Sequence, residues 1–351
     1  MRLSIYLLIT CAALAAFIGT QSAHGQIPPQ WDLCTGKADV EWDRQIKYCT
    51  ALIESGKETP QGMAVAYCNR GNAWSAKGDL DRAITDYSEA IRVDPKYARA
   101  YYNLGYAWQA EGDLDRAIAN YSEAIKLDPK SISYSNRGAA WSAKGDLDHA
   151  IADYDEAIHL DPKLAGVYAN RGKAWRLKGD FDRAIADYDE AIKLDPKNAK
   201  AHNGRGVFWY DKGDFDRAIA DYDEAINLAP KFSAPYSNRA IVWHAKGDAD
   251  RAIADYDEAI KLDPKFAFAY NNRGIAWHAK GDADRAIADY DEAIKLDPKY
   301  ANAYYNRGLA WEDKHVLERA LADFRKFTEL APSNSAGPKA IERVTKALSG
   351  R

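Results

Sequence analysis

Two histidines stand in identical surroundings in this chain and have the strongest claim to metal chemistry. The segments 243–265 and 277–299 share one sequence, so His244 and His278 occupy equivalent places. A zinc site in a protein needs roughly three or four ligands in a closed geometry. No further His or Cys stands at a matching place beside the two imidazoles. We therefore expect no metal site and interpret both histidines as part of a binding surface.

Sequence patterns that indicate catalysis or a bound cofactor are missing. The chain has no phosphate-binding loop, no Gly-x-Ser-x-Gly elbow and no His-Glu-x-x-His. Its many carboxylates recur at a regular period, which predicts helix caps and solvated helix faces rather than acid-base catalysis. The sequence thus predicts a protein that is not an enzyme and that holds no cofactor.

The composition is that of a chain with ample material for a core. Of 351 residues, 47% are apolar and 28% are charged, and the formal net charge is -4. This balance argues against a disordered chain and against a membrane-embedded bundle. Asp, Lys and Arg alternate along the chain, so we expect no basic surface that could neutralise phosphates and no binding to nucleic acid.

The N-terminal segment differs from the rest of the chain. Arg2 is followed by an apolar run from Leu3 to Gly19, and Ala23 and Gly25 are spaced like a small-residue cleavage site. We interpret 1–25 as a cleaved secretory signal, which predicts a periplasmic or secreted protein with no transmembrane segment after cleavage. The alternative is an uncleaved anchor in the inner membrane, although the run is slightly short for a span of about 20 residues.

Internal repetition is the dominant feature of the sequence. The string Asp-Arg-Ala-Ile and its close variants recur with a period of 34 and one step of 33, which defines eight units between 64 and 334. Each unit has two short apolar stretches at helical spacing, separated by a Gly-Asp pair. In the second unit Gly112 can end the first helix and Asp113 can cap the second, while Pro129 follows its end. Such helical hairpins must stack to bury their apolar faces, so the pattern predicts a solenoid.

The residues of these units carry a family resemblance. In the second unit they are Tyr101, Leu104, Gly105, Trp108, Gly112, Ala117, Tyr121, Ala124 and Pro129. This pattern resembles the tetratricopeptide repeat (TPR) signature with Tyr and Trp exchanged. The resemblance implies an all-α, right-handed α-solenoid of eight tandem helix-turn-helix repeats at 64–334. We expect an N-terminal cap at 26–63 and a C-terminal capping helix at 335–351, which Pro338 begins.

Two sets of small and aromatic residues recur with the repeats. The glycines equivalent to Gly105 are predicted to sit where the two helices of a hairpin touch. The tryptophans equivalent to Trp108 are predicted to pack in the core beside them, rather than to form a stacking platform for sugars or bases.

An arginine and an aspartate vary together across the units. Seven units have Arg on the first helix and Asp on the second, and the remaining unit has Leu104 and Asn120 at these places. We predict that each Arg pairs with the Asp of its own hairpin in a partly buried seam, as in Arg171 with Asp187 and Arg273 with Asp289. The alternative is two exposed and independent charges of little energetic value.

Three cysteines remain once the signal is removed. Asp43-Arg44-Gln45-Ile46 begins a worn copy of a second helix, in which Cys49 falls where Tyr121 stands in the second unit. Cys34 lies in the preceding segment, and export makes a disulfide plausible. We predict a Cys34–Cys49 disulfide that closes the N-terminal cap, with Cys68 as a single thiol.

The family resemblance also implies a groove, lined by the first helices, that holds a partner protein or peptide. The residues expected to line it are Asn72, Arg99, Tyr102, Tyr106, Lys173, Arg176, Lys200, Asn203, Tyr210, His244, Phe268, Asn271, His278 and Tyr305. Lys173, Arg176 and Lys200 predict an acidic partner segment over the middle units. The clamp with which some TPR proteins hold chaperone C-termini requires a Lys where this chain has Cys68, so we do not expect that ligand.

The sequence therefore predicts a non-catalytic scaffold or adaptor that acts outside the cytoplasm. Two other functions stay open: a solenoid that binds carbohydrate or another small ligand through its Tyr and Trp faces, and an accessory subunit of an envelope enzyme. Repeats this similar also permit self-association.

Overall fold

The computed structural model describes residues 29–36 and 41–350, and within them every regular element is an α-helix. The predicted signal segment 1–25 lies outside the described residues. The chain divides into two compact units between Asp187 and Tyr188, inside α10 (Phe181–Leu194). Residues 29–187 are called the N-terminal unit and residues 188–350 the C-terminal unit, and each has hydrophobic core clusters of its own.

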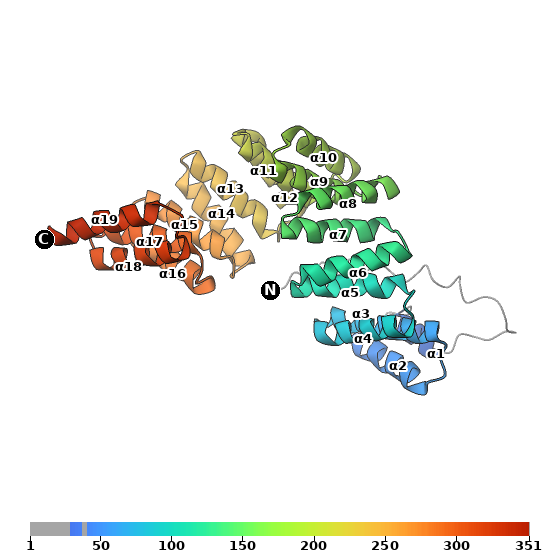
Figure 1. The fold of residues 1–351 in the computed structure, drawn as a ribbon. Coiled ribbons are helices and arrows are strands. Elements are labelled where there is room, and N and C mark those ends of the chain that lie inside the picture. The colour runs from blue at the N-terminus through green and yellow to red at the C-terminus, as the bar shows by residue number, and fades with distance from the viewer. Residues whose placement is uncertain (1–28, 37–40, 351) are drawn as a thin grey trace. The chain divides into compact units, whose positions relative to one another are not determined.

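The N-terminal unit is a series of helices that pack in antiparallel pairs (Figure 1). Besides the first part of α10, its helices are α1 (Pro29–Thr35), α2 (Trp42–Ser55), α3 (Pro60–Ala76), α4 (Leu80–Val93), α5 (Ala98–Glu111), α6 (Leu114–Leu127), α7 (Ser131–Lys144), α8 (Leu147–Leu160) and α9 (Ala165–Lys178). Each hairpin consists of a first and a second helix, such as α5 and α6. The second helix also packs on the first helix of the next hairpin, and successive first helices contact one another.

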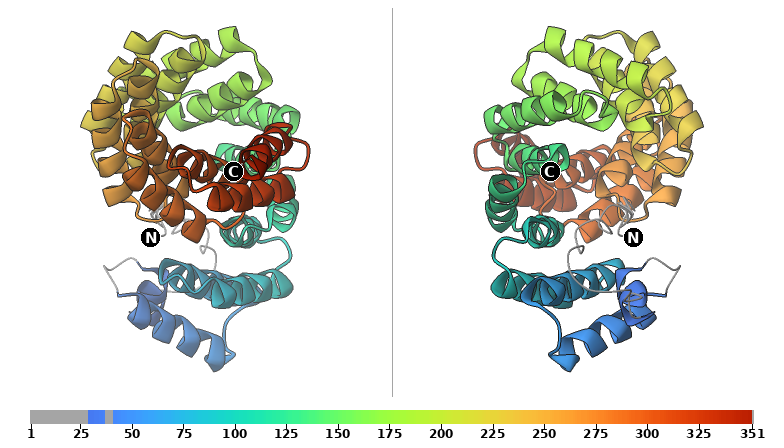
Figure 2. Two further views of the ribbon diagram at one scale, coloured as in Figure 1. Left: turned by 90° about the vertical axis from the view of Figure 1, so that its left-hand side faces the viewer. Right: turned by 90° about the vertical axis from the view of Figure 1, so that its right-hand side faces the viewer.

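The C-terminal unit repeats the same arrangement. After the last part of α10, its helices are α11 (Ala199–Asp211), α12 (Phe215–Leu228), α13 (Ser233–Ala245), α14 (Ala249–Leu262), α15 (Ala267–Ala279), α16 (Ala283–Leu296), α17 (Ala301–Asp313), α18 (Leu317–Leu330) and α19 (Ala336–Ser349). In both views of Figure 2 the coloured ribbon consists of helices joined by short loops. The described residues thus form the predicted all-helical stack of hairpins.

Local sequence explains where each helix of a hairpin ends and the next begins. Gly112 has φ 88° and ends α5 in the left-handed conformation, which residues with a side chain rarely adopt. Asp113 then accepts a 2.9 Å hydrogen bond from the backbone N–H of Arg116, which caps α6. This bond and the ion pair with Arg116 hold the pKa of Asp113 below its ordinary value. In the last hairpin His315 takes the place of the glycine with φ 59°.

The two helices of a hairpin approach most closely at a glycine and a buried ring. A Cβ atom added to Gly274 would lie 2.6 Å from Cε1 of Tyr290, so no larger residue fits without movement. Tyr121, Tyr154 and Phe324 fill the same place in other hairpins and are almost fully buried. The prediction that these glycines lie at the helix contact is confirmed.

The tryptophans lie at the edge of the core and are only partly buried. In seven hairpins an Arg near the start of the second helix covers the indole, as Arg82 does with its Cζ 3.7 Å from the ring centroid of Trp74. In the remaining hairpin the His149 ring stacks on Trp141 at 4.9 Å. Such cation–aromatic contacts are worth about 0.5–1 kcal/mol at exposed sites. The tryptophans therefore pack against the core on one side and carry a basic side chain on the other.

Both ends of the repeat array carry additional helices. Cys34 in α1 and Cys49 in α2 form the predicted disulfide, both are fully buried, and α2 packs on α3 as a second helix does. Cys68 is a buried free cysteine. At the other end Val344 of α19 is buried against α18, and Ile341 and Leu348 pack around it.

Two helix boundaries differ from the sequence prediction. α3 begins at Pro60, about one turn before the first repeat unit, because Thr59 accepts a hydrogen bond from the backbone N–H of Gly62 and Pro60 suits the first helical position. α19 begins at Ala336, two residues before the Pro338 that we expected to start it. Proline is tolerated there because the first turn of a helix has no intrahelical acceptors for its N–H groups.

Candidate partner-binding surface

The first helices of each unit form a row whose common face is the candidate binding surface. It consists of four equivalent positions per helix, at spacings of three, four and three residues, which share one side of a helix. We call this set the A-face. In the N-terminal unit the positions are 65, 68, 72 and 75 on α3; 99, 102, 106 and 109 on α5; 132, 135, 139 and 142 on α7; and 166, 169, 173 and 176 on α9. In the C-terminal unit they are 200, 203, 207 and 210 on α11; 234, 237, 241 and 244 on α13; 268, 271, 275 and 278 on α15; and 302, 305, 309 and 312 on α17.

The A-face of the N-terminal unit holds predicted residues with accessible side chains. Tyr106 on α5 is 48% exposed. Lys173 on α9 is exposed, while Arg99 and Arg176 are partly buried. These three cations are the charged residues among the sixteen A-face positions of this unit, and none of the sixteen is acidic.

Other predicted residues of this unit link the first helices together. Asn72 accepts a 2.8 Å hydrogen bond from Nδ2 of Asn103 and a 2.9 Å bond from the Tyr87 hydroxyl. The Tyr102 hydroxyl accepts a 2.8 Å bond from Nδ2 of Asn136. Burial raises the pKa of Tyr102 to about 12. Asn72 and Tyr102 thus hold neighbouring helices together.

The A-face of the C-terminal unit has a different character. Lys200 is exposed at the start of α11, and Phe268 on α15 is 40% exposed. Tyr210 stacks on Phe215 at 5.8 Å, and His244 is partly buried. Nε2 of His278 lies 2.7 Å from Oδ2 of Asp313, whereas the residue equivalent to Asp313 beside His244 is Ala279. The two histidines with identical flanking sequence therefore have different surroundings.

In the C-terminal unit three residues predicted to line the groove serve the framework instead. Asn271 is only 2% exposed, so its placement on an open surface was wrong: it accepts a 2.9 Å bond from Nδ2 of Asn306. Asn203 accepts the equivalent bond from Asn238. Tyr305 packs on the core rings of Phe324 and Phe327, with centroids 5.5 and 4.9 Å away. These side chains contact neighbouring helices because the second A-face position of a first helix also faces the next hairpin.

A seam of ion pairs joins the two helices in seven of the eight hairpins. Nε and Nη2 of Arg171 lie 2.8 and 2.7 Å from the two carboxylate oxygens of Asp187, and Arg273 grips Asp289 in the same way. The structure thus brings both predicted pairs together. The hydrogen bonds to Asp187 raise the pKa of Arg171 above its ordinary value.

A third contact of this arginine was not predicted from the sequence. Nη1 of Arg171 reaches Asp155 of the preceding hairpin at 2.6 Å, and Arg273 reaches Asp257 at the same distance. Arg137 reaches a hydroxyl instead, Oγ of Ser122 at 2.9 Å. The signal was present in the sequence, since the residue after the core tyrosine is Ser in the first two hairpins and Asp in the next five.

Three sequence models of tetratricopeptide repeats match the chain: one at 169–233, a second at 71–112, 242–281 and 276–314, and a third at 98–131 and 131–164. Together they cover most of the hairpins described above. The chain belongs to the tetratricopeptide repeat family.

Solved structures of other TPR proteins share the fold. A TPR protein from Parabacteroides merdae is 22% identical, with a TM-score of 0.60 over 70% of this chain and 98% of its own. Yeast Tom70 is 16% identical, with a TM-score of 0.52 over 92% and 95%. A chain of the Cut9–Hcn1 hetero-tetramer of APC/C is 15% identical, with a TM-score of 0.63 over 90% and 62%. At these identities the likeness concerns the fold alone. No curated protein sequence matches the chain.

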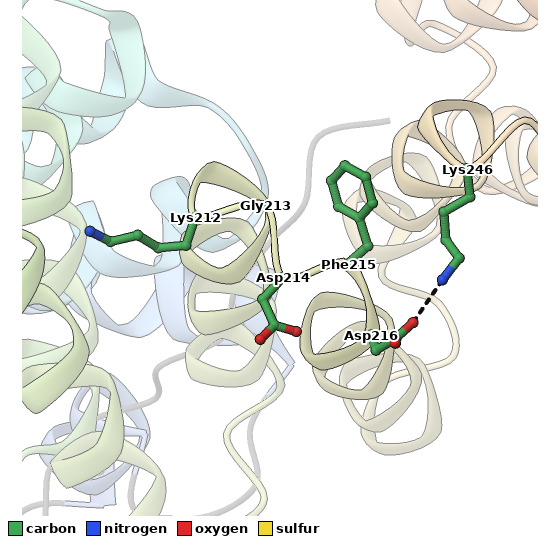
Figure 3. A pocket seen from close by; sticks show the side chains of 6 residues that line it. All are labelled: Lys212, Gly213, Asp214, Phe215, Asp216 and Lys246. Atoms are coloured by element: carbon green, nitrogen blue, oxygen red, sulfur yellow. Dashed lines mark hydrogen bonds and ion pairs between the residues drawn. The ribbon is translucent and has the colours of Figure 1, made fainter.

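The TPR scaffold has shallow recesses where a hairpin turn meets the next first helix. One of about 420 Å³ is lined by Lys212, Gly213, Asp214, Phe215, Asp216 and Lys246, and Lys246 pairs with Asp216 across it at 2.7 Å (Figure 3). An equivalent recess of about 630 Å³ lies at the turn that contains Gly112. Both arise from capping and pairing groups that recur in the TPR framework, and neither contains a predicted groove residue.

Neither a metal cluster nor a membrane span emerges from the part of the chain that the structure describes. Over 29–36 and 41–350, no group of three or more His, Cys, Asp or Glu side chains could hold a metal ion. In the same residues no helix has both the length and the apolar content to cross a membrane. As a member of the TPR family, the chain is a repeat scaffold of a type that typically mediates protein–protein interaction and is typically non-catalytic.

Proposed function

We propose that this TPR scaffold acts outside the cytoplasm and binds an acidic segment of a partner protein on the A-face of its N-terminal unit. The observation that carries the proposal is the charge of that surface: Arg99, Lys173 and Arg176 are cationic, and none of its positions is acidic. Among these cations Lys173 takes part in no ion pair in the described residues, whereas the nearby Lys144 pairs with Asp115 and Lys178 with Asp148. A surface with one sign of charge attracts the opposite sign and orients it during encounter.

Lys200 was predicted from the sequence to contact the same acidic segment. It lies in the C-terminal unit, where it is the one cation among the A-face positions and Glu312 is the one acid. Glu312 is already bound by Nε and Nη2 of Arg343, at 2.7 Å each. Because Lys200 lies outside the proposed surface, the A-face of the N-terminal unit, it serves as the control for the two cations of α9.

Crosslinking in intact cells, followed by capture of the protein, tests this function. We compare the wild type with a Lys173→Glu/Arg176→Glu variant and with Lys200→Glu. Reversing two surface charges is expected to weaken capture of a partner about tenfold, which corresponds to about 1.4 kcal/mol. Lys200→Glu should capture the same partner as the wild type. Equal capture by all three proteins would refute the proposed surface.

Export is supported by the sequence of 1–25 and by the buried Cys34–Cys49 disulfide, since structural disulfides persist in oxidising compartments. Cell fractionation and N-terminal sequencing test it. The mature chain is expected to begin at Gln26 and to appear outside the cytoplasm. A cytoplasmic protein that keeps 1–25 would contradict export without affecting the proposed binding surface.

The carbohydrate alternative has less support from the geometry. Its main candidate was the row of tryptophans, and one face of each ring is covered by Arg or His. A sugar would have to displace these side chains in order to stack there.

A further inference from the structure

We propose that the A-face of the N-terminal unit selects an acidic segment that also carries large apolar side chains, and not a simple polyanion. This inference rests on the proposed function and specifies the partner's chemistry. Tyr106 is an A-face residue of α5, and Leu177 adjoins the A-face position of Arg176 on α9; their side chains are 48% and 50% exposed. Leu177 follows Lys173 by one helical turn, so a cation and an apolar side chain are neighbours on α9.

The charges on this surface define one part of the ligand. Lys173 is exposed, and no ion pair in the described residues involves it, unlike Lys144 and Lys178 of the same unit. A carboxylate of the partner would supply the missing counter-charge. Arg176, three residues further along α9, lies on the same side of the helix, and no acidic residue stands at an A-face position of this unit.

The exposed apolar side chains define the other part. The Tyr106 ring and Leu177 present apolar surface that becomes stabilising only when something apolar covers it. A polyanion such as a nucleic acid backbone or an acidic polysaccharide satisfies the cations but leaves Leu177 uncovered. A segment in which acidic and large apolar residues are interleaved satisfies both.

The order of the helices sets the expected length of the segment. α5 contacts α7 and α7 contacts α9, so Tyr106 and Leu177 are separated by two steps between packed helices. Each step is about 8–10 Å. An extended chain advances about 3.3 Å per residue, so the two apolar residues of the ligand are expected about five or six positions apart.

Fluorescence anisotropy with synthetic peptides tests the inference on the purified protein. The first probe is an extended peptide of Glu and Ser with one Phe and one Leu about six positions apart. The second has Ser in place of both apolar residues, and the third is oligoglutamate. We expect the first probe to bind about tenfold more tightly than the other two, with all three weakened by Lys173→Glu and by added salt.

Matched variants separate the two contributions. Tyr106→Ala is expected to reduce the affinity of the first probe about fivefold and to leave the other two unchanged. Phe268→Ala removes a ring that is 40% exposed from the C-terminal unit and should change none of the affinities. Because both rings are exposed, circular dichroism should show that the variants keep their fold.

The outcomes distinguish the two proposals. Equal affinity for all three peptides, together with sensitivity to Lys173→Glu, would overturn this inference and keep the acidic-partner function. The same inference fails if Phe268→Ala, and not Tyr106→Ala, weakens the first probe. Insensitivity of every peptide to Lys173→Glu would overturn both.

Discussion

The A-faces of the two units differ at the position equivalent to Asn72, although the hairpins beneath them are alike. In the N-terminal unit this position changes its chemistry from hairpin to hairpin, as Asn72, Tyr106, Ala139 and Lys173. In the C-terminal unit it stays aliphatic, as Val207, Ile241, Ile275 and Leu309. One unit thus presents distinct groups along its row of first helices, and the other presents a uniform apolar line. The difference shows that packing within a hairpin does not fix the residue type at this position, which can therefore vary for recognition.

The two units do not differ in the seam of ion pairs, which both contain. Arg171 with Asp187 belongs to the N-terminal unit and Arg273 with Asp289 to the C-terminal unit, with the same geometry within 0.1 Å. Side-chain exposure is also equal: 20% for each Arg, and 8% and 9% for the two Asp. If the units differ only in recognition, perturbing this seam must affect both equally.

The largest expected effect tests that equality. Arg171→Ala leaves the Asp187 carboxylate buried without its partner, which should lower the free energy of unfolding by about 3 kcal/mol. Arg273→Ala should cost the same in the C-terminal unit. Denaturant unfolding of the single variants and of the Arg171→Ala/Asp187→Ala double variant measures the coupling.

A double variant as unstable as the sum of its single variants would show two independent charges and remove the seam hypothesis. Unequal costs for Arg171→Ala and Arg273→Ala would show that the units also differ in how they are held together.

The disulfide offers a test that only the N-terminal unit should register. Removing Cys34–Cys49 by a double Ser substitution frees a loop of about 15 residues in the unfolded chain, which should cost about 3 kcal/mol or somewhat less. Hydrogen exchange should accelerate in α1, α2 and α3 while α11 to α19 keep their rates. Cys68→Ser is the control, because Cys68 is not disulfide-bonded. Faster exchange in both units would show that the cap stabilises more than its neighbours.

The smallest expected effect belongs to the C-terminal unit alone and concerns pH. His202 stands where the other hairpins have Tyr, is nearly buried, and lies with Nδ1 3.4 Å from Oδ1 of Asp221. The hydrogen bond to Asp221 raises the pKa of His202 above its ordinary value of 6.5. Protonation therefore favours the folded state below that value, and this stabilisation disappears as the pH rises through the folded pKa.

The melting temperature of the C-terminal unit is accordingly expected to fall slightly as the pH rises from about 6 to about 8. His202→Tyr should flatten that slope. An unchanged slope in the His202→Tyr protein would mean that the Asp221 contact carries no such linkage.

Most of the fold could be predicted from the sequence because each hairpin repeats the same local signals. Gly112, Asp113 and Pro129 mark helix ends by backbone conformation and capping, which depend on few neighbours. The start of α3 was missed because Thr59 and Pro60 supply a cap that the repeat pattern does not contain. Cys34 and Cys49 could be paired because their helices occupy recognisable places in the pattern.

The candidate surface was harder to predict, since helix periodicity gives the face of a residue but not its partner. Tyr106, Phe268 and Lys173 are exposed, whereas Asn271 and Tyr305 lie against the next helix or the core. The difference depends on which residues lie opposite, and these are distant in the sequence, as Asn306 is from Asn271 and Phe327 from Tyr305. The additional ion pair between a seam arginine and the preceding hairpin, as between Arg171 and Asp155, was missed for the same reason.

That additional ion pair has a consequence for how the chain can change in length. Arg307 bonds Asp291 of the hairpin before it just as Arg273 bonds Asp257. Each of these hairpins therefore presents an Asp to the hairpin that follows and an Arg to the hairpin that precedes it. Loss or duplication of one 34-residue unit among these copies would again place such an Arg next to such an Asp. A gene encoding this region can therefore lengthen or shorten by unequal recombination without creating a junction that the protein does not already contain.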